Sequence, residues 1–199
     1  MTSDDSQTDQ WEERFAGALK ALVRARGGKG DLGALAELSR YTRGQIPTFG
    51  AASSLLAVLP DWVKEKQMAD VFLTAGLFAE HREHSVTHRS LGASLGAYRA
   101  QKHGDVDSCP TDTRLKVLLG SPRAGLDHHL RQAITLLDGI SVNYAQLLRD
   151  VLNWENTRFR YDGLTYAESL RLSWLRDYDR MARTAYARSV SLSGDEETS

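Results

Sequence analysis

The chain has 199 residues, 41% of them hydrophobic and 26% charged, with a net charge of −1. It contains no apolar run of the roughly 20 residues that a membrane-spanning helix requires, and its acidic, polar start lacks the basic and apolar parts of a secretory signal. Cys109 is the only cysteine, which excludes an internal disulfide framework and a multi-cysteine metal site, so we expect a cytoplasmic protein.

Helical periodicity dominates the chain and alternating strand patterns are nearly absent, so the sequence predicts an all-α fold. A first helix should begin at Asp9, with Glu12 three residues on forming a capping box. The glycines at 27–30 should end this helix. Its apolar face is expected to hold Trp11, Phe15, Ala18, Leu22 and Val23. Further elements of this half are expected as helices over 32–38, 55–59 and 61–79, with a loop over 41–50.

A polar break over 103–110 divides the predicted helices into two groups. Before it we expect a loop or linker over 81–88 and a helix over 91–101. Beyond it, apolar periodicity predicts helices around 115–119, from Ser121-Pro122 to Leu137, over 142–155 and over 165–185. The expected organisation is an N-terminal helical bundle over 9–104, a C-terminal four-helix bundle over 110–186, and disordered acidic ends at 1–8 and 187–199.

The histidines of the 81–88 segment are the first candidates for chemistry. His81, His84 and His88 could ligate zinc if the backbone brought them into one site, which would make the chain a small metal-dependent helical enzyme. The pattern lacks the HExxH order and has no cysteine support, so a solvated loop is the simpler interpretation. Serine-nucleophile, Walker-type and dinucleotide-binding motifs do not occur. We therefore expect no catalytic activity and no cofactor.

Basic side chains away from the apolar stripes are the second candidates. On the last helix, Arg176, Arg180 and Arg183 share a face that differs from the expected core stripe. Arg114 and Lys116 flank Leu115, and Arg123 and Arg131 lie on the helix that follows Ser121. Such positions suit contacts to phosphates. An exposed face with salt bridges one helical turn apart explains them equally well, so both interpretations remain open.

The distribution of charge limits the form that a nucleic-acid contact could take. The first and last nine residues hold six of the 26 acidic residues and no Lys or Arg, which leaves a small basic excess in the rest of the chain. A contact with a polyanion would therefore be a local ridge of basic side chains rather than a field over the whole surface.

The order of the short helical patterns resembles the CasB family, the small subunit of the type I-E CRISPR surveillance complex called Cascade. The resemblance covers roughly residues 11–180. It is carried by His88-Arg89-Ser90-Leu91-Gly92, Asp112–Leu119, Leu126–Leu137, Tyr144–Trp154 and Trp174–Tyr178. Each pattern is short, and their ordered series is what makes the resemblance specific.

This resemblance implies an all-helical, non-catalytic protein, present in two copies beside the backbone and large subunits of Cascade. It implies sequence-independent contacts that stabilise the guide RNA–target DNA heteroduplex and the displaced, non-target strand of the R-loop. The family's basic positions carry over to Arg114, Lys116, Arg123 and Arg131, and also to Lys102 and Arg89. The alternative is a helical scaffold that binds only proteins, with its arginines facing solvent or pairing with acidic partners.

Overall fold

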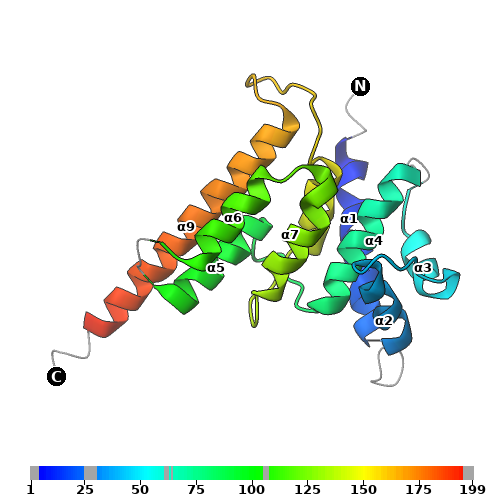
Figure 1. Cartoon of the computed structure of the whole chain (residues 1–199), viewed down its shortest axis with the longest axis horizontal. Helices are drawn as coiled ribbons and strands as arrows, with labels where there is room; N and C mark the ends of the chain where they lie inside the picture. The colour runs from blue at the N-terminus through cyan, green and yellow to red at the C-terminus, as the bar shows by residue number, and fades with distance from the viewer. Residues whose placement is uncertain (1–4, 25–30, 61–62, 64, 105–107, 195–199) are drawn as a thin grey trace. The chain divides into compact units, whose positions relative to one another are not determined.

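A computed structural model describes the backbone of residues 5–24, 31–60, 63, 65–104 and 108–194, and within these ranges it is all-α (Figure 1). The described part of the chain holds no strand, and Phe159 and Thr165 form an isolated β-bridge. None of its described helices is both long enough and apolar enough to span a membrane. The chain divides into two compact units, Met1–Ser85 with Asn143–Asn153, and Val86–Val142 with Trp154–Ser199.

The first unit contains α1 (Asp5–Arg24), α2 (Leu32–Tyr41), α3 (Phe49–Leu56), α4 (Glu65–Glu80) and α8 (Tyr144–Leu152). Burial of periodic apolar side chains drives these helices together. Fully buried members of this core include Phe15, Leu19, Leu35, Leu38, Leu55 and Phe78. The start of α2 is fixed by Asp31, whose carboxylate accepts a hydrogen bond from the Ala34 amide at 2.9 Å.

Helix α8 joins the first unit although it follows α4 by more than sixty residues in the chain. The ring of Tyr144 is buried and meets Phe78 edge-on, with the ring centroids 5.2 Å apart. Arg149 Nε on the same helix lies 3.3 Å from the carboxylate of Glu12 on α1. Glu12 is buried inside α1 rather than at its start, so its predicted capping-box role is wrong. Its carboxylate instead holds α1 to α8.

The second unit contains α5 (Leu91–His103), α6 (Pro110–Gly120), α7 (Arg123–Thr135) and α9 (Tyr166–Gly194). Its central feature is the close approach of α5 to α9. A Cβ atom on Gly92 would stand 2.2 Å from the carbonyl oxygen of Trp174, and one on Gly96 would stand 2.3 Å from that of Tyr178. Only hydrogen atoms fit at these two positions, which lets the backbones of the two helices touch.

Hydrogen bonds and an aromatic contact hold α9 against other segments of the second unit. Ser90 caps α5 by accepting from the Ala93 amide at 3.2 Å, and its hydroxyl donates to Asp177 at 2.8 Å. The ring centroids of Trp154 and Trp174 lie 5.3 Å apart in the interior, and Trp154 Nε1 donates to a backbone carbonyl at 3.0 Å. These contacts join segments that are far apart in the sequence.

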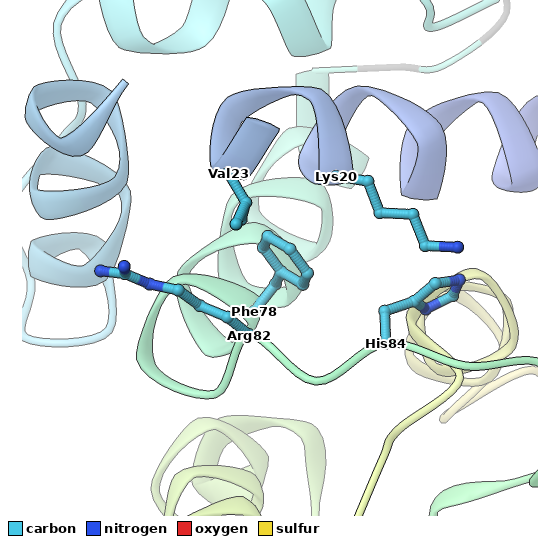
Figure 2. A pocket seen from close by; sticks show the side chains of 5 residues that line it. All are labelled: Lys20, Val23, Phe78, Arg82 and His84. Carbon is cyan, nitrogen blue, oxygen red and sulfur yellow. The ribbon is translucent and has the colours of Figure 1, made fainter. Parts of the chain in front are cut away.

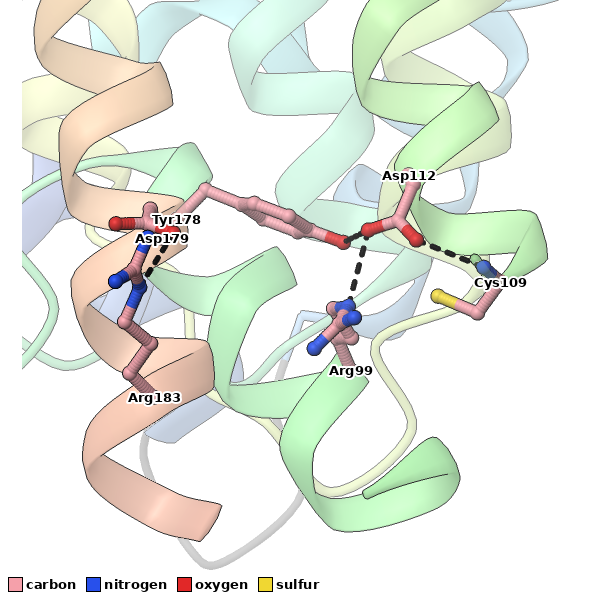
Figure 3. Close-up of polar contacts among 6 residues, drawn as sticks. All are labelled: Arg99, Cys109, Asp112, Tyr178, Asp179 and Arg183. Carbon is pink, nitrogen blue, oxygen red and sulfur yellow. Dashed lines mark hydrogen bonds and ion pairs between the residues drawn. The ribbon is translucent and has the colours of Figure 1, made fainter. Parts of the chain in front are cut away.

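Asp112 connects three helices of the second unit (Figure 3). Its carboxylate accepts hydrogen bonds from the Tyr178 hydroxyl, from Arg99 Nε at 3.0 Å and from the Cys109 amide at 2.7 Å. Burial raises the pKa of Asp112, but the hydrogen bonds and the Arg99 charge outweigh burial and hold it below its ordinary value. The carboxylate is therefore ionised at neutral pH.

The two units differ from the division expected from the sequence. The 103–110 break lies inside the second unit, because α5 packs on α9 through its glycines and not on the helices that precede it. The second unit does hold four described helices, with α5 taking the place expected for α8. Periodicity marked the apolar face of α5 but carried no information on which helix covers it.

Element boundaries also shift. Helix α1 begins at Asp5 and α9 continues to Gly194, so both reach into ends that we expected to be disordered. The helix predicted over 55–59 lies instead at Phe49–Leu56. Ala16 and Leu19 are buried on α1, whereas Ala18 and Val23 of the expected face are only half-buried. The predicted helix start at Asp61 and the glycines at 27–30 lie outside the described residues.

Candidate nucleic-acid interface

All nine predicted nucleic-acid-binding residues belong to the second unit. They lie before or on α5 (Arg89, Lys102), on α6 (Arg114, Lys116), on α7 (Arg123, Arg131) and on α9 (Arg176, Arg180, Arg183). Each is exposed or half-buried, so each can reach solvent. They therefore divide into an α6–α7 group, an α9 group and two separate positions on α5 or just before it.

Helices α6 and α7 lie against one another, and Arg114 joins them (Figure 1). Its Nη1 donates to the side-chain oxygen of Gln132 on α7. Both residues line a surface hollow of about 370 Å³ together with Pro110, Thr113 and Val117. The pairing with a neutral amide holds the guanidinium in place without cancelling its charge, which suits a contact to a phosphate at this hollow.

The other three basic side chains of α6 and α7 differ in their burial and in whether an acidic side chain offsets their charge. Lys116 is exposed and makes no hydrogen bond or ion pair within the described ranges. Arg123 pairs with Asp127 one turn along α7, so part of its charge is offset. Arg131 is half-buried, and its Nε atom is buried with no hydrogen-bond partner in the part of the chain that is described. Arg123, Asp127 and Arg131 follow one another at helical spacing, so the acid lies between the two cations.

The α9 arginines form exposed ion pairs on their own helix. Arg180 lies 2.8 Å from Asp177, and Arg183 lies 2.9 Å from Asp179 (Figure 3). Such surface pairs contribute little and exchange readily with other partners. Arg176 is exposed, as are Arg89 and Lys102. Acids on the same helix therefore offset Arg180 and Arg183, as Asp127 offsets Arg123, whereas Arg176 has no acidic partner in the described part of the chain.

Two histidines of the 81–88 segment, His81 and His84, are hydrogen-bonded to Tyr144 on α8. The Tyr144 hydroxyl donates to the His81 carbonyl at 2.7 Å, and the Tyr144 amide donates to Nδ1 of His84 at 3.1 Å. Both histidines thus support the packing of α8. His88 belongs to the second unit, and burial lowers its pKa. Among the described residues no three His, Cys, Asp or Glu side chains are placed to hold a metal ion.

Sequence reasoning missed a small hollow in the first unit (Figure 2). It measures about 190 Å³ and is lined by Lys20, Val23, Phe78, Arg82 and His84. The ammonium of Lys20 points toward the His84 ring, whereas the guanidinium of Arg82 points to the opposite side, so the cations do not converge. Val23 and Phe78 supply the apolar part of its lining. No local pattern signals it, because its walls come from separate helices.

In the Arg158-Phe159-Arg160-Tyr161 run before α9, the sequence indicated the two arginines as candidates for phosphate contacts but not the exposed aromatic residues between and after them. Phe159 is 76% exposed and Tyr161 is 96% exposed, whereas the rings of Trp154, Trp174 and Tyr178 in the same unit are buried. The alternation of arginine with aromatic residues, followed by Asp162-Gly163 as a turn pair, is the signal that could have identified these exposed rings.

Comparisons with known proteins give likenesses in sequence and in fold. The sequence model of the family described as CRISPR-associated protein Cse2 matches residues 34–178, more than half of the chain. The crystal structure of CasB from Thermus thermophilus has a TM-score of 0.62 at 23% identity, covering 84% of this chain and 96% of that one. CasB from M. ruber has a TM-score of 0.65 at 20% identity, with coverages of 88% and 98%.

A chain from a structure described as a CRISPR RNA-guided surveillance complex shares the fold as well. Its TM-score is 0.61 at 20% identity, covering 91% of this chain and 98% of that one. No curated protein matches the chain. The family match confirms the resemblance found in the sequence, and the solved structures confirm the fold.

Proposed function

Because the chain belongs to the CRISPR-associated Cse2 family, we propose that it is the non-catalytic small subunit of an RNA-guided surveillance complex in the cytoplasm. Its partners are a guide RNA, the target and non-target DNA strands, the backbone and large subunits, and a second copy of itself. It stabilises the guide RNA–target DNA heteroduplex and the displaced strand through contacts to the phosphate backbone. These contacts do not depend on sequence.

The family match is the observation that carries this proposal. It spans 34–178 and so includes α6 and α7 with their four basic side chains, whereas Arg180 and Arg183 lie beyond it. Within the α6–α7 group, Arg114 and Lys116 have no acidic partner among the described residues, a property that they share with Arg89, Lys102 and Arg176. We therefore assign the principal strand contact to α6 and α7, and secondary contacts to Arg89, Lys102 and the α9 arginines.

The physics of an R-loop explains how such a modest basic surface has an effect. Forming the R-loop exchanges a DNA duplex for an RNA–DNA heteroduplex of similar stability, so a few backbone contacts can shift the balance. The isolated chain has a net charge of −1 and should bind nucleic acid weakly. Assembly with other subunits raises the effective concentration of the strands near α6 and α7.

The first test is purification of the tagged chain from its native host at native expression. A short processed RNA and several other subunit types should copurify with it in defined ratios. Recovery of the chain alone, or with proteins but without RNA, would contradict the assignment to an RNA-guided complex.

The second test reverses the four α6–α7 cations in that purified complex. Arg114→Glu, Lys116→Glu, Arg123→Glu and Arg131→Glu together should shorten the lifetime of the R-loop on target DNA while the complex still assembles. The matched control reverses four exposed arginines of the first unit, Arg14, Arg40, Arg43 and Arg82. Equal R-loop lifetimes in both variants would show that α6 and α7 do not hold the strands.

A protein scaffold without nucleic-acid contact is the second candidate function. The ion pairs of Arg123, Arg180 and Arg183 with acids on their own helices favour it, since these cations already have partners. Ultraviolet crosslinking of the complex distinguishes the two functions. Crosslinks from α6 or α7 peptides to RNA or DNA support strand binding, and crosslinks confined to other subunits support the scaffold.

A further inference from the structure

The segment that leads into α9 is a hydrogen-bonded hairpin, which we call the aromatic hairpin (residues 158–166, the last being the first residue of α9). Its backbone is tied by hydrogen bonds from Arg160 N to Leu164 O at 2.7 Å and from Tyr166 N to Arg158 O at 3.0 Å. Gly163 takes a φ of +82°, which allows the tight turn at its tip. In Figure 1 it is the golden loop that leads into α9. Its side chains therefore project from a backbone that its own hydrogen bonds define.

Three large rings of this hairpin face solvent. Phe159 is 76% exposed, Tyr161 is 96% exposed and Tyr166 is 44% exposed. The guanidinium of Arg160 lies 5.8 Å from the centroid of the Tyr161 ring and 5.7 Å from that of Tyr166, within cation–π range of both. Leaving such rings in water is unfavourable, so this arrangement points to an external partner for them.

The charges around the hairpin favour an anionic partner. Each carboxylate between residues 155 and 168 is already bound within the protein. Glu155 accepts from the Arg123 amide at 2.8 Å, Asp162 from the Leu164 amide at 3.2 Å, and Glu168 from the Thr165 amide at 2.8 Å. Asp162 also lies 3.4 Å from Arg160 Nε, so the charge of Arg160 is offset within the hairpin. The Arg158 guanidinium is exposed and has no acidic partner within the described ranges. The hairpin thus presents aromatic faces beside an available cation.

We propose that the aromatic hairpin is a stacking platform for unpaired bases of a single-stranded nucleic acid, with Phe159 and Tyr161 contacting bases and Arg158 contacting a phosphate. Exposed rings interleaved with arginine are the arrangement that binds single strands without reading their sequence. The exposed neighbours Thr157, Asp162 and Gly163 are polar or lack a side chain, so the rings do not merge into the continuous apolar core of a protein interface. This inference rests on the proposed function and adds base contacts to its phosphate contacts.

The test separates base stacking from phosphate binding. The full chain is titrated with an oligothymidylate and with a strand of the same length and charge that lacks bases, at low salt. The parent should prefer the base-bearing strand by about fivefold or more for each stacked base. In Phe159→Ala/Tyr161→Ala this preference should disappear while the salt dependence stays unchanged. Phe49→Ala, which removes an 80% exposed ring from the first unit, should keep the preference.

The outcomes separate this proposal from the function on which it rests. If the parent binds both strands equally and with a normal salt dependence, the stacking proposal is wrong and the phosphate contacts stand. If neither strand binds even at low salt, the stacking proposal is wrong, whereas the phosphate contacts of the proposed function are decided separately by the R-loop lifetimes of the assembled complex. If strand binding is unaffected but the double variant no longer enters the assembled complex, the hairpin binds a protein and the stacking proposal is wrong. Photocrosslinks from 4-thiothymidine to the 158–166 peptide would support it independently.

Discussion

Tyr178 on α9 donates its phenolic hydrogen to the carboxylate of Asp112 on α6, across 66 positions of the sequence. The same carboxylate forms a hydrogen-bonded ion pair with Arg99 of α5, so one ionised group joins three helices of the second unit. Burial raises the pKa of Tyr178, and its hydrogen bond to Asp112 raises it further. The phenol therefore stays protonated, as a donor, across the physiological range of pH.

Replacement of Asp112 should reveal this role through its pH dependence. The pKa of Asp112 in the folded chain is held below its ordinary value of 3.8, so the stabilisation is complete above that value and disappears as pH falls through the folded pKa. Asp112→Asn should lower the free energy of unfolding by about 2 kcal/mol at pH 7, and by progressively less as the pH falls below 3.8 toward pH 2. Urea denaturation at both pH values measures this. Asp179→Asn, at an exposed ion pair, should change little at either pH.

Substitution of Gly92 should disrupt the α5–α9 contact. Its added Cβ would meet the Trp174 carbonyl oxygen at 2.2 Å, so the two helices must separate. We expect Gly92→Ala to lower the free energy of unfolding by about 3 kcal/mol. Gly17→Ala on α1 is the control, because a Cβ there meets nothing within 4 Å and should stabilise the helix by about 0.5–1 kcal/mol. Equal thermal denaturation of Gly92→Ala and the parent would mean that the helices are farther apart.

Removal of the Tyr144 hydroxyl should weaken the first unit. Its hydrogen bond to the His81 carbonyl at 2.7 Å holds the end of the α4 segment to α8. Tyr144→Phe should cost about 1 kcal/mol of unfolding free energy and should speed amide hydrogen exchange around His81 and His84. Tyr161→Phe, at a 96% exposed ring, is the matched control and should have no effect on either. Unchanged exchange rates in Tyr144→Phe would show that the hydroxyl does not order this segment.

Lys116 should contribute one phosphate contact. Its exposed ammonium has no partner in the described ranges, so binding to a strand releases counterions without breaking an internal ion pair. Lys116→Ala should reduce the slope of log affinity against log salt by about 0.7 for single-stranded DNA. Lys116→Arg should restore it. Titrations between 50 and 200 mM salt measure the slopes, and an unaltered slope in Lys116→Ala would remove this residue from the interface.

Local sequence patterns predicted much of the candidate site. Arg114 and Lys116 were identified from their positions beside Leu115, and both lie on α6 with access to solvent. The sequence did not show that Gln132 holds Arg114. It also did not show that Asp127 and Asp179 pair with Arg123 and Arg183 and offset their charge. The exposure of Phe159 and Tyr161 was likewise not evident from the sequence. Those properties depend on which side chains meet after folding, and spacing along one helix does not specify them.

The sequence by itself determined the all-α class, the approximate positions of most helices and the family resemblance, because a 3.6-residue apolar period and its helix caps are local properties of the chain. Only the tertiary structure decided that α5 packs on α9, that α8 belongs with α1 and α4, and that Asp112 joins α5, α6 and α9. The reason is physical: an apolar stripe requires burial but fits many partners. The partner of α5 was selected by two glycines that permit backbone contact and by a serine bonded to an aspartate 87 positions away.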